Sequence, residues 1–152
     1  MIKENWTSKE YQEYAKTGKL PDGSKSKKKN KFGAVKKTYK GRVYHSTAEA
    51  DWAALLDLRI KAGEIKKWKP QFRIELKSNN IHVCYYYIDF KVWMSDDSIE
   101  FHEVKGKKLQ EWKTKWKWMK TILKDLEPNS IMVLIQKIKG QFKETERFKD
   151  FS

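Results

Sequence analysis

The chain lacks the features that mark membrane and secreted proteins. No apolar run approaches the roughly 20 residues needed to cross a bilayer, so the sequence excludes a transmembrane protein. The first ten residues contain no apolar core of a secretory signal, and the single cysteine, Cys84, cannot form an internal disulfide. We therefore expect no membrane partner and a reducing compartment such as the cytoplasm.

Two common binding motifs are also missing. His45, His82 and His102 lack the spacing of metal ligands, and with one cysteine they indicate no zinc site. There is no glycine-rich phosphate loop, so the sequence does not support hydrolysis of a nucleoside triphosphate.

Acidic residues are few relative to basic ones. The 152 residues include 34 Lys and Arg but only 20 Asp and Glu, which gives a formal net charge of +14. Aromatic residues make up 14%, so the chain has enough apolar surface to fold and is not a disordered polycation. The length fits one domain with a real core. The positive excess predicts a polyanionic partner, most simply DNA.

The positive charge is concentrated near the start of the chain. Residues 1–45 contain 13 basic and 4 acidic residues, a net of +9, and the other 107 residues contain 21 and 16, a net of +5. We predict a short helix and flexible basic arm over 1–37, a folded domain over 38–138, and a charged tail over 139–152 whose phenylalanines could dock it. Seven arm lysines are candidate DNA contacts, or else merely solubilise the chain: Lys25, Lys27, Lys28, Lys29, Lys31, Lys36 and Lys37.

The hydrophobic pattern of the domain predicts an α/β fold. Ser46 to Glu49 is a capping box that opens a helix ending near Ala62. The remaining expected elements are strands at 38–44, 72–76, 81–94, 99–105 and 131–138, and a helix at 109–126. From the first helix onward the order is helix, three strands, helix, strand, which indicates a central mixed sheet flanked by helices.

Three acids lie where packing alone would not place them. Glu49 falls in the apolar arc of the first helix, and Asp89 interrupts an aromatic and aliphatic strand. Glu103 shares a strand face with Lys105. Each has an ordinary explanation: helix-start chemistry for Glu49, a bulge or edge position for Asp89, and a solvated salt bridge for the Glu103–Lys105 pair.

The coincidence of these residues favours a catalytic site. Asp89 and Glu103 lie on consecutive strands joined by a short turn, so pairing would bring them close. Like charges held together require a cation, and oxygen ligands favour Mg²⁺ or Mn²⁺ over zinc. Lys105 could orient or deprotonate a water, or stabilise phosphate charge. This set suits metal-assisted hydrolysis of a phosphodiester.

The same residues resemble the PD-(D/E)xK nuclease superfamily. Asp89 is followed, after a hairpin, by Glu103-Val104-Lys105, and Glu49 lies on a preceding helix. Further segments between residues 30 and 135 resemble a small phage-encoded endonuclease family akin to RecB-type nucleases and Holliday-junction resolvases: Asn30-Lys31-Phe32-Gly33, Lys36-Lys37-Thr38, Gly41, Ser46-x-x-Glu49-Ala50, Ala62-Gly63-Glu64-Ile65, Gln71-Phe72, Asp89-Phe90 and Glu103-Val104-Lys105-Gly106. Ile88 replaces the proline in the superfamily's name, but an apolar residue preserves the strand.

The resemblance implies a restriction-endonuclease-like core and individual roles. The implied site comprises Asp89, Glu103 and the Val104 backbone carbonyl as metal ligands, Lys105 as catalytic lysine, Glu49 as an acid at or behind the metal, and Gln71 as a lining residue. It implies a DNA endonuclease that uses Mg²⁺ or Mn²⁺, encoded by a phage or prophage in a bacterial host. Branched or recombination DNA is the favoured substrate.

The second expected helix carries a row of lysines. The row could follow a phosphate backbone or form an ordinary solvated face, and it consists of Lys113, Lys117, Lys120 and Lys124. Trp112 and Trp116 belong to the apolar stripe of this helix, which leaves Trp118 as the better base-stacking candidate. Without a base-reading motif, we expect recognition of DNA backbone and shape.

A protein of another class is the alternative: a non-catalytic basic DNA-binding module on the same fold. Such a module has no reason to hold Asp89 and Glu103 side by side. A resolvase would also need two active sites and hence a homodimer, for which no self-complementary surface can be recognised in the sequence.

Overall fold

The computed structural model describes residues 35–105 and 110–149, together with Lys9 and Gln12, which are both helical. The chain divides into two compact units, Met1–Gly33 and Ala34–Ser152, and the fold below is that of the second. Most of the predicted N-terminal helix and five arm lysines lie outside the described residues: Lys25, Lys27, Lys28, Lys29 and Lys31. Lys36 and Lys37 are described, and both are exposed.

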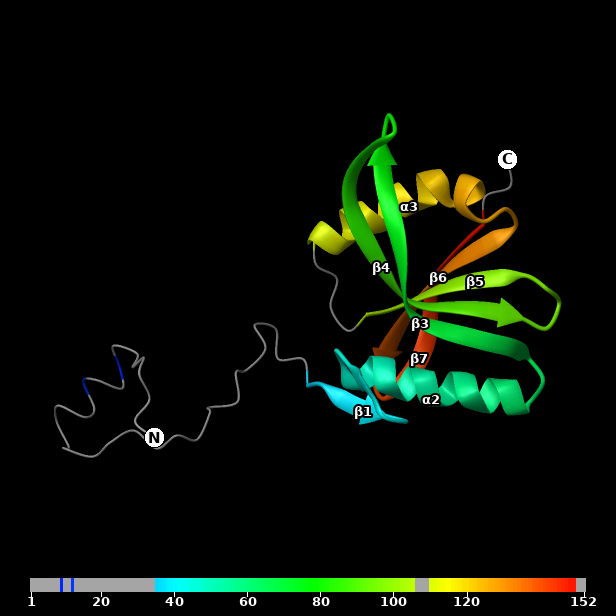
Figure 1. The fold of residues 1–152 in the computed structure, drawn as a ribbon. Coiled ribbons are helices and arrows are strands. Elements are labelled where there is room, and N and C mark those ends of the chain that lie inside the picture. Colours follow the sequence, from blue (N-terminus) through cyan, green and yellow to red (C-terminus); the bar gives the residue numbers. More distant parts are fainter. Residues whose placement is uncertain (1–8, 10–11, 13–34, 106–109, 150–152) are drawn as a thin grey trace. The chain divides into compact units, whose positions relative to one another are not determined.

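The second unit is a mixed α/β domain built on a five-stranded sheet (Figure 1). A hairpin of β1 (Lys37–Tyr39) and β2 (Arg42–Tyr44) precedes the first helix of this unit, α2 (Thr47–Lys61). The later elements are β3 (Ile65–Ser78), β4 (Ile81–Met94), β5 (Ile99–Lys105), α3 (Gln110–Leu126), β6 (Ser130–Ile138) and β7 (Gln141–Lys149). The strands lie in sequence order, all neighbours antiparallel except β5 and β6, which α3 connects in parallel.

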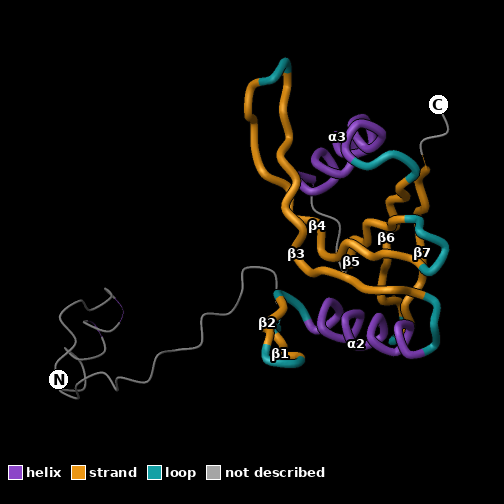
Figure 2. Tube along the Cα trace, turned by 45° about the vertical axis from the view of Figure 1, so that its right-hand side comes forward, coloured by secondary structure: helices purple, strands orange, loops and turns teal. Residues whose placement is uncertain are grey.

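One helix covers each face of the sheet (Figure 1). Helix α2 packs through Trp52 and Leu56 into one core cluster, and α3 packs through Trp116, Met119 and Leu123 into the other. Figure 2 shows the β3–β4 hairpin extending beyond the other strands, next to α3. Among the described helices, none is both long and apolar enough to cross a membrane.

Helix α2 begins and ends where its sequence predicts. The backbone of Ser46 is extended, and its hydroxyl oxygen accepts a hydrogen bond from the Glu49 amide at 3.1 Å. At the other end of the helix, the Ala62 N–H donates a hydrogen bond to the Leu58 carbonyl at 2.9 Å. Gly63 follows with a φ of 77°, a conformation that favours glycine. The helix thus presents Glu49 from its first turn.

The structure extends the sheet beyond the predicted strands. Strand β3 starts at Ile65 rather than residue 72, because its charged first half pairs with the end of β4 in spite of its polar composition. The segment predicted as a charged tail forms β7, which pairs with β6. Phe142 packs edge-on against Trp52 with ring centroids 5.0 Å apart, and Phe148 packs against the α3 cluster. The aromatic residues expected to dock a tail therefore dock a strand.

Candidate active site

The candidate site lies where β4 and β5 separate. Their ladder ends at the pair Phe90–His102, and the next pair would place Asp89 opposite Glu103. There, the Val104 N–H donates to Asp89 Oδ2 at 2.8 Å, so a carboxylate takes the place of a backbone acceptor. β4 lies between β3 and β5, and the β3–β4 register shifts fall elsewhere. Asp89 is therefore not on an outer strand of the sheet, but it does lie at a local irregularity, because the β3–β4 ladder skips the Gln71–Asp89 position between the pairs Pro70–Phe90 and Phe72–Ile88.

Glu103 and Lys105 form a partly buried pair in which the carboxylate is inside the protein. The Lys105 Nζ lies 2.6 Å from Glu103 Oε1, and the Glu103 residue is 1% exposed. The other carboxylate oxygen, Glu103 Oε2, is buried without a hydrogen-bond partner. An ordinary surface ion pair is thus excluded for these two residues, because one partner and an unpaired oxygen are inside the protein.

Glu49 contributes to both the helix cap and the acid cluster. Its Oε1 accepts from the Ser46 hydroxyl at 3.1 Å, while its Oε2 is buried without a partner. The charges of Asp89 and Lys105 both act on its pKa, so the first turn of α2 lies close to the middle of β4 and the end of β5. Helix-start chemistry accounts for only one of its two oxygens.

Burial shifts the pKa of every acid in this cluster upward. It raises the pKa of Glu49 to about 7 and that of Glu103 to about 8, and the charge of Asp89 adds to both shifts. Burial also raises the pKa of Asp89, although Lys105 and the Val104 N–H oppose it. Burial alone would lower the pKa of Lys105, but the charges of the three carboxylates raise it. Lys105 is therefore a cation at neutral pH.

Gln71 reaches the cluster from β3. Its Nε2 donates to Asp89 Oδ1 across a long 3.4 Å. Its φ is +49°, which is uncommon for a residue other than glycine, and regular pairs with β4 flank it on both sides. Such a local strain is typical of functional positions. The structure thus places Gln71 beside Asp89, where the resemblance implies a lining residue.

The donor set has the chemistry of a site for a hard divalent cation. Two carboxylate oxygens, on Glu49 and Glu103, are buried without partners, and an ion would satisfy them. Oxygen donors suit Mg²⁺ or Mn²⁺. Within residues 35–105 and 110–149, however, no three His, Cys, Asp or Glu side chains are already arranged as a metal-ligand set. Lys105 contacts one oxygen of Glu103, and the Val104 N–H donates to one oxygen of Asp89.

The lysine row of α3 is only partly solvated. Lys113, Lys117 and Lys124 are exposed. Lys120 instead forms an ion pair with Glu146, and its ammonium lies 5.9 Å and 5.3 Å from the ring centroids of Trp116 and Phe148. In the arm, Lys37 pairs with Asp51 at 2.7 Å. The predicted stacking residue Trp118 packs partly buried against the α3 cluster.

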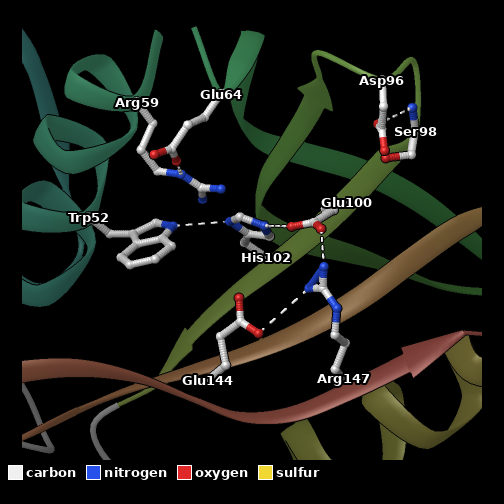
Figure 3. Close-up of polar contacts among 9 residues, drawn as sticks. All are labelled: Trp52, Arg59, Glu64, Asp96, Ser98, Glu100, His102, Glu144 and Arg147. Carbon is white, nitrogen blue, oxygen red and sulfur yellow. Dashed lines mark hydrogen bonds and ion pairs between the residues drawn. The ribbon is translucent and has the colours of Figure 1, made fainter. Parts of the chain in front are cut away.

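A second polar network, which the sequence did not reveal, lies on the α2 side of β5 (Figure 3). Trp52 Nε1 donates to His102 Nδ1 at 3.2 Å, and His102 Nε2 lies 2.7 Å from Glu100 Oε2. Arg147 of β7 also pairs with Glu100. Because Nδ1 accepts, the proton of neutral His102 is on Nε2, and burial lowers the pKa of this imidazole. His102 points toward Trp52 of α2 and so away from its neighbour on β5, Glu103.

The fold and site define a mixed α/β domain with three buried carboxyls beside a lysine. The profile of the family described as "Protein of unknown function (DUF1064)" matches residues 29–144, so the chain belongs to this family. No curated protein and no solved structure matches the chain. The family description assigns no activity, and the fold by itself does not define one.

Proposed function

We propose that this protein is a divalent-metal-dependent DNA endonuclease with a restriction-endonuclease-like core. One observation carries the proposal: Asp89 and Glu103 are both buried on neighbouring strands, together with Lys105, and each carboxyl has a raised pKa. Burying like charges costs stability unless a bound ion compensates it. A protein that only binds DNA gains nothing from that cost.

The order of elements supports the proposed core. Helix α2, strands β3 to β5, helix α3 and strand β6 follow one another as the resemblance implies. The acids lie at the end of β5 and on the strand and helix next to it, so one corner of the domain collects them. The function of the protein therefore depends on the chemistry of the three acids and Lys105 at this corner of the domain.

The residues of the site divide the proposed chemistry among them. Asp89, Glu103 and the Val104 carbonyl would hold Mg²⁺ or Mn²⁺, with Glu49 beside them. Such an ion supplies positive charge near a phosphate and lowers the pKa of a bound water. Lys105 is protonated, so we assign it to stabilising negative charge on the phosphate rather than to removing a proton. Glu49, whose Oε2 is buried without a hydrogen-bond partner, would hold the ion or a water bound to it.

The proposed DNA partner, substrate, origin and oligomeric state rest on the resemblance to the nuclease superfamily and on the positive charge of the chain. Exposed lysines on α3 and in the arm favour binding to the DNA backbone. The resemblance supports a branched or recombination substrate, a phage or prophage origin with a cytoplasmic site of action, and a homodimer. The alternative stays a non-catalytic DNA-binding module on the same fold.

Cleavage of supercoiled plasmid and of a four-way junction tests the proposal. We expect nicking with Mg²⁺ or Mn²⁺ and none with EDTA. Asp89→Asn and Lys105→Ala should each lower the cleavage rate by about 100-fold or more, with DNA affinity nearly unchanged. Asp97→Asn is the matched control, because this exposed carboxylate pairs with Lys66 away from the site.

Two results would overturn the enzyme proposal. One is that no divalent ion supports cleavage by the wild-type protein. The other is that Asp89→Asn and Lys105→Ala cleave as fast as the wild type. If DNA still binds in either case, the non-catalytic module is the better description.

A further inference from the structure

An aromatic pocket lies directly beside the acid cluster. It has a volume of about 260 Å³, and its lining includes Tyr85, Tyr86, Tyr87 and Trp112 together with Glu103 and Lys105. The tyrosines belong to the part of β4 that continues past the separation from β5, and Trp112 belongs to the first turn of α3. The same two residues, Glu103 and Lys105, thus belong to the candidate active site and to the wall of this pocket.

Polar atoms without partners are concentrated around this pocket. Six buried side-chain polar atoms of the described residues lack a hydrogen-bond partner, and three of them belong to pocket residues: the Tyr86 hydroxyl, Trp112 Nε1 and Glu103 Oε2. Tyr86 is 4% exposed. Trp112 and Glu103 also act on the pKa of the Tyr86 hydroxyl, so the three groups lie next to one another, and a polar ligand edge that enters here meets all of them.

The Trp112 ring is held in a defined position. It stacks on Trp116, with ring centroids 5.5 Å apart and an interplanar angle of 28°. The ammonium of Lys105 lies 5.8 Å from its centroid. A fixed aromatic ring next to a cation suits the stacking of a flat ligand that carries a phosphate.

We propose that this pocket receives an unpaired nucleobase of the DNA strand whose phosphate lies at Glu103 and Lys105. The aromatic lining suits any base, because every base has a π-face. The indole N–H and the phenol hydroxyl could pair with polar groups on the edge of the base. The position of the strand rests on the proposed function. Because unstacking costs least for a base that is already unpaired, the substrate class becomes DNA with unpaired nucleotides next to the cut.

Binding of the full-length protein to two probes in EDTA tests this inference. One probe is a duplex with a single unpaired 2-aminopurine, and the other is the same duplex with 2-aminopurine paired to thymine. We expect about tenfold tighter binding to the unpaired probe, which is the size expected for one stacked base. We also expect 2-aminopurine fluorescence to be quenched in that complex only, through stacking on tryptophan.

Two variants and a matched control connect the effect to the pocket. Trp112→Ala should abolish both the preference and the quenching. Tyr86→Phe keeps the ring and removes a hydroxyl that lies beside Trp112 and Glu103, so it should stay folded and lose about two- to threefold of the preference. Trp93→Ala removes a half-buried tryptophan at the other end of β4 and should leave the preference unchanged.

The outcomes separate this inference from the proposed function. Equal affinity and equal fluorescence for the two probes would overturn the base pocket even if the protein cleaves DNA with Mg²⁺. An unchanged preference in Tyr86→Phe and in folded Trp112→Ala would also overturn it. A preference that depends on Trp112, in a protein that no divalent ion activates, would support the pocket and contradict the nuclease.

Discussion

Asp89 connects the candidate site to the fold, because its carboxylate accepts the Val104 N–H at 2.8 Å in place of a backbone carbonyl. Asparagine at this position keeps an acceptor oxygen and removes the charge. Alanine would leave the Val104 amide buried without a partner, which costs about 1–3 kcal/mol. Asp89→Asn is therefore the variant that separates the chemical role of this residue from its structural role.

The raised pKa values of Glu49 and Glu103 predict how stability depends on pH in the absence of metal. A carboxyl whose pKa is higher in the folded state binds its proton more tightly there. Its contribution is fully present below the unfolded value of 4.5 and is lost as the pH rises through about 7 for Glu49 and about 8 for Glu103. In EDTA, we expect the free energy of unfolding in urea to fall between about pH 5 and pH 8 and to level off above that.

Glu103→Gln provides the test of this pH dependence. The variant should lose much of the decline between about pH 5 and pH 8, while Glu64→Gln, at an exposed carboxylate, should keep it. Mn²⁺ should restore stability to the wild type at high pH, because an ion favours the ionised acids. If the free energy of unfolding of the wild type in EDTA is constant across this range, the carboxyls of Glu49 and Glu103 have the same pKa in the folded and unfolded states, which would contradict the prediction.

At the scale of elements, the Trp52–His102–Glu100–Arg147 network joins α2, β5 and β7 (Figure 3). It lies on the face of β5 that the acid cluster does not use. Glu100 is 3% exposed, so its charge depends on partners from β5 and β7. The network thereby stabilises the strand that carries Glu103.

Removing His102 should destabilise the domain without altering the chemistry directly. We expect His102→Ala to lower the free energy of unfolding by about 3 kcal/mol, since it leaves Trp52 Nε1 unpaired and Glu100 short of a donor. Urea denaturation followed by tryptophan fluorescence measures this. His82→Ala, at an exposed histidine paired with Glu75, should have little effect. Equal stability of the two variants would show that the buried network contributes nothing.

The lysines of α3 are predicted to act as phosphate contacts only where they are solvated. Replacing Lys113 and Lys117 together by glutamine should reduce the slope of log K against log salt by about two, at 0.9 per phosphate contact. The control is a double variant that removes the same two positive charges elsewhere, Lys61→Gln on α2 together with Lys66→Gln on β3. An equal loss of slope in both double variants would indicate a general charge effect rather than a binding face.

Most elements of this domain could be predicted from local sequence. Ser46 and Gly63 mark the ends of α2, and strands 81–94 and 99–105 have the predicted bounds, because capping, turn residues and apolar alternation act over short distances. Strand β7 could not be predicted this way. It is polar throughout except at Phe142 and Phe148, and it becomes a strand by pairing with β6, which a charged pattern does not encode.

The acid cluster was predictable for a similar reason, whereas the pocket was not. Asp89 interrupts an apolar strand, and an acid there stands out in the sequence. Trp112 falls within an apolar helical stripe, so the pattern assigns it to the core. Only the tertiary arrangement shows that its ring lines a pocket beside Glu103. The spacing of apolar residues along a helix predicts which face is apolar. It does not predict whether a neighbouring strand packs tightly against that face or leaves a pocket.

At the scale of the whole molecule, the charge is divided between a basic arm and a more nearly neutral domain. The first 45 residues carry a net of +9, against +5 for the other 107. We expect deletion of residues 1–30 to weaken DNA binding and to flatten its salt dependence, while metal binding at the acid cluster is unchanged. An identical salt slope for the full chain and the shortened chain would show that the arm does not contact phosphate.

The position of a bound Mn²⁺ ion would show whether the acid cluster is the metal site of this protein. An anomalous difference map from crystals grown with Mn²⁺ should show a peak within coordination distance, about 2.0–2.4 Å, of carboxylate oxygens of both Asp89 and Glu103. The Val104 carbonyl should be a third ligand. A peak at other residues only, or no peak at Mn²⁺ concentrations that support cleavage, would contradict the assignment of this cluster as the catalytic metal site.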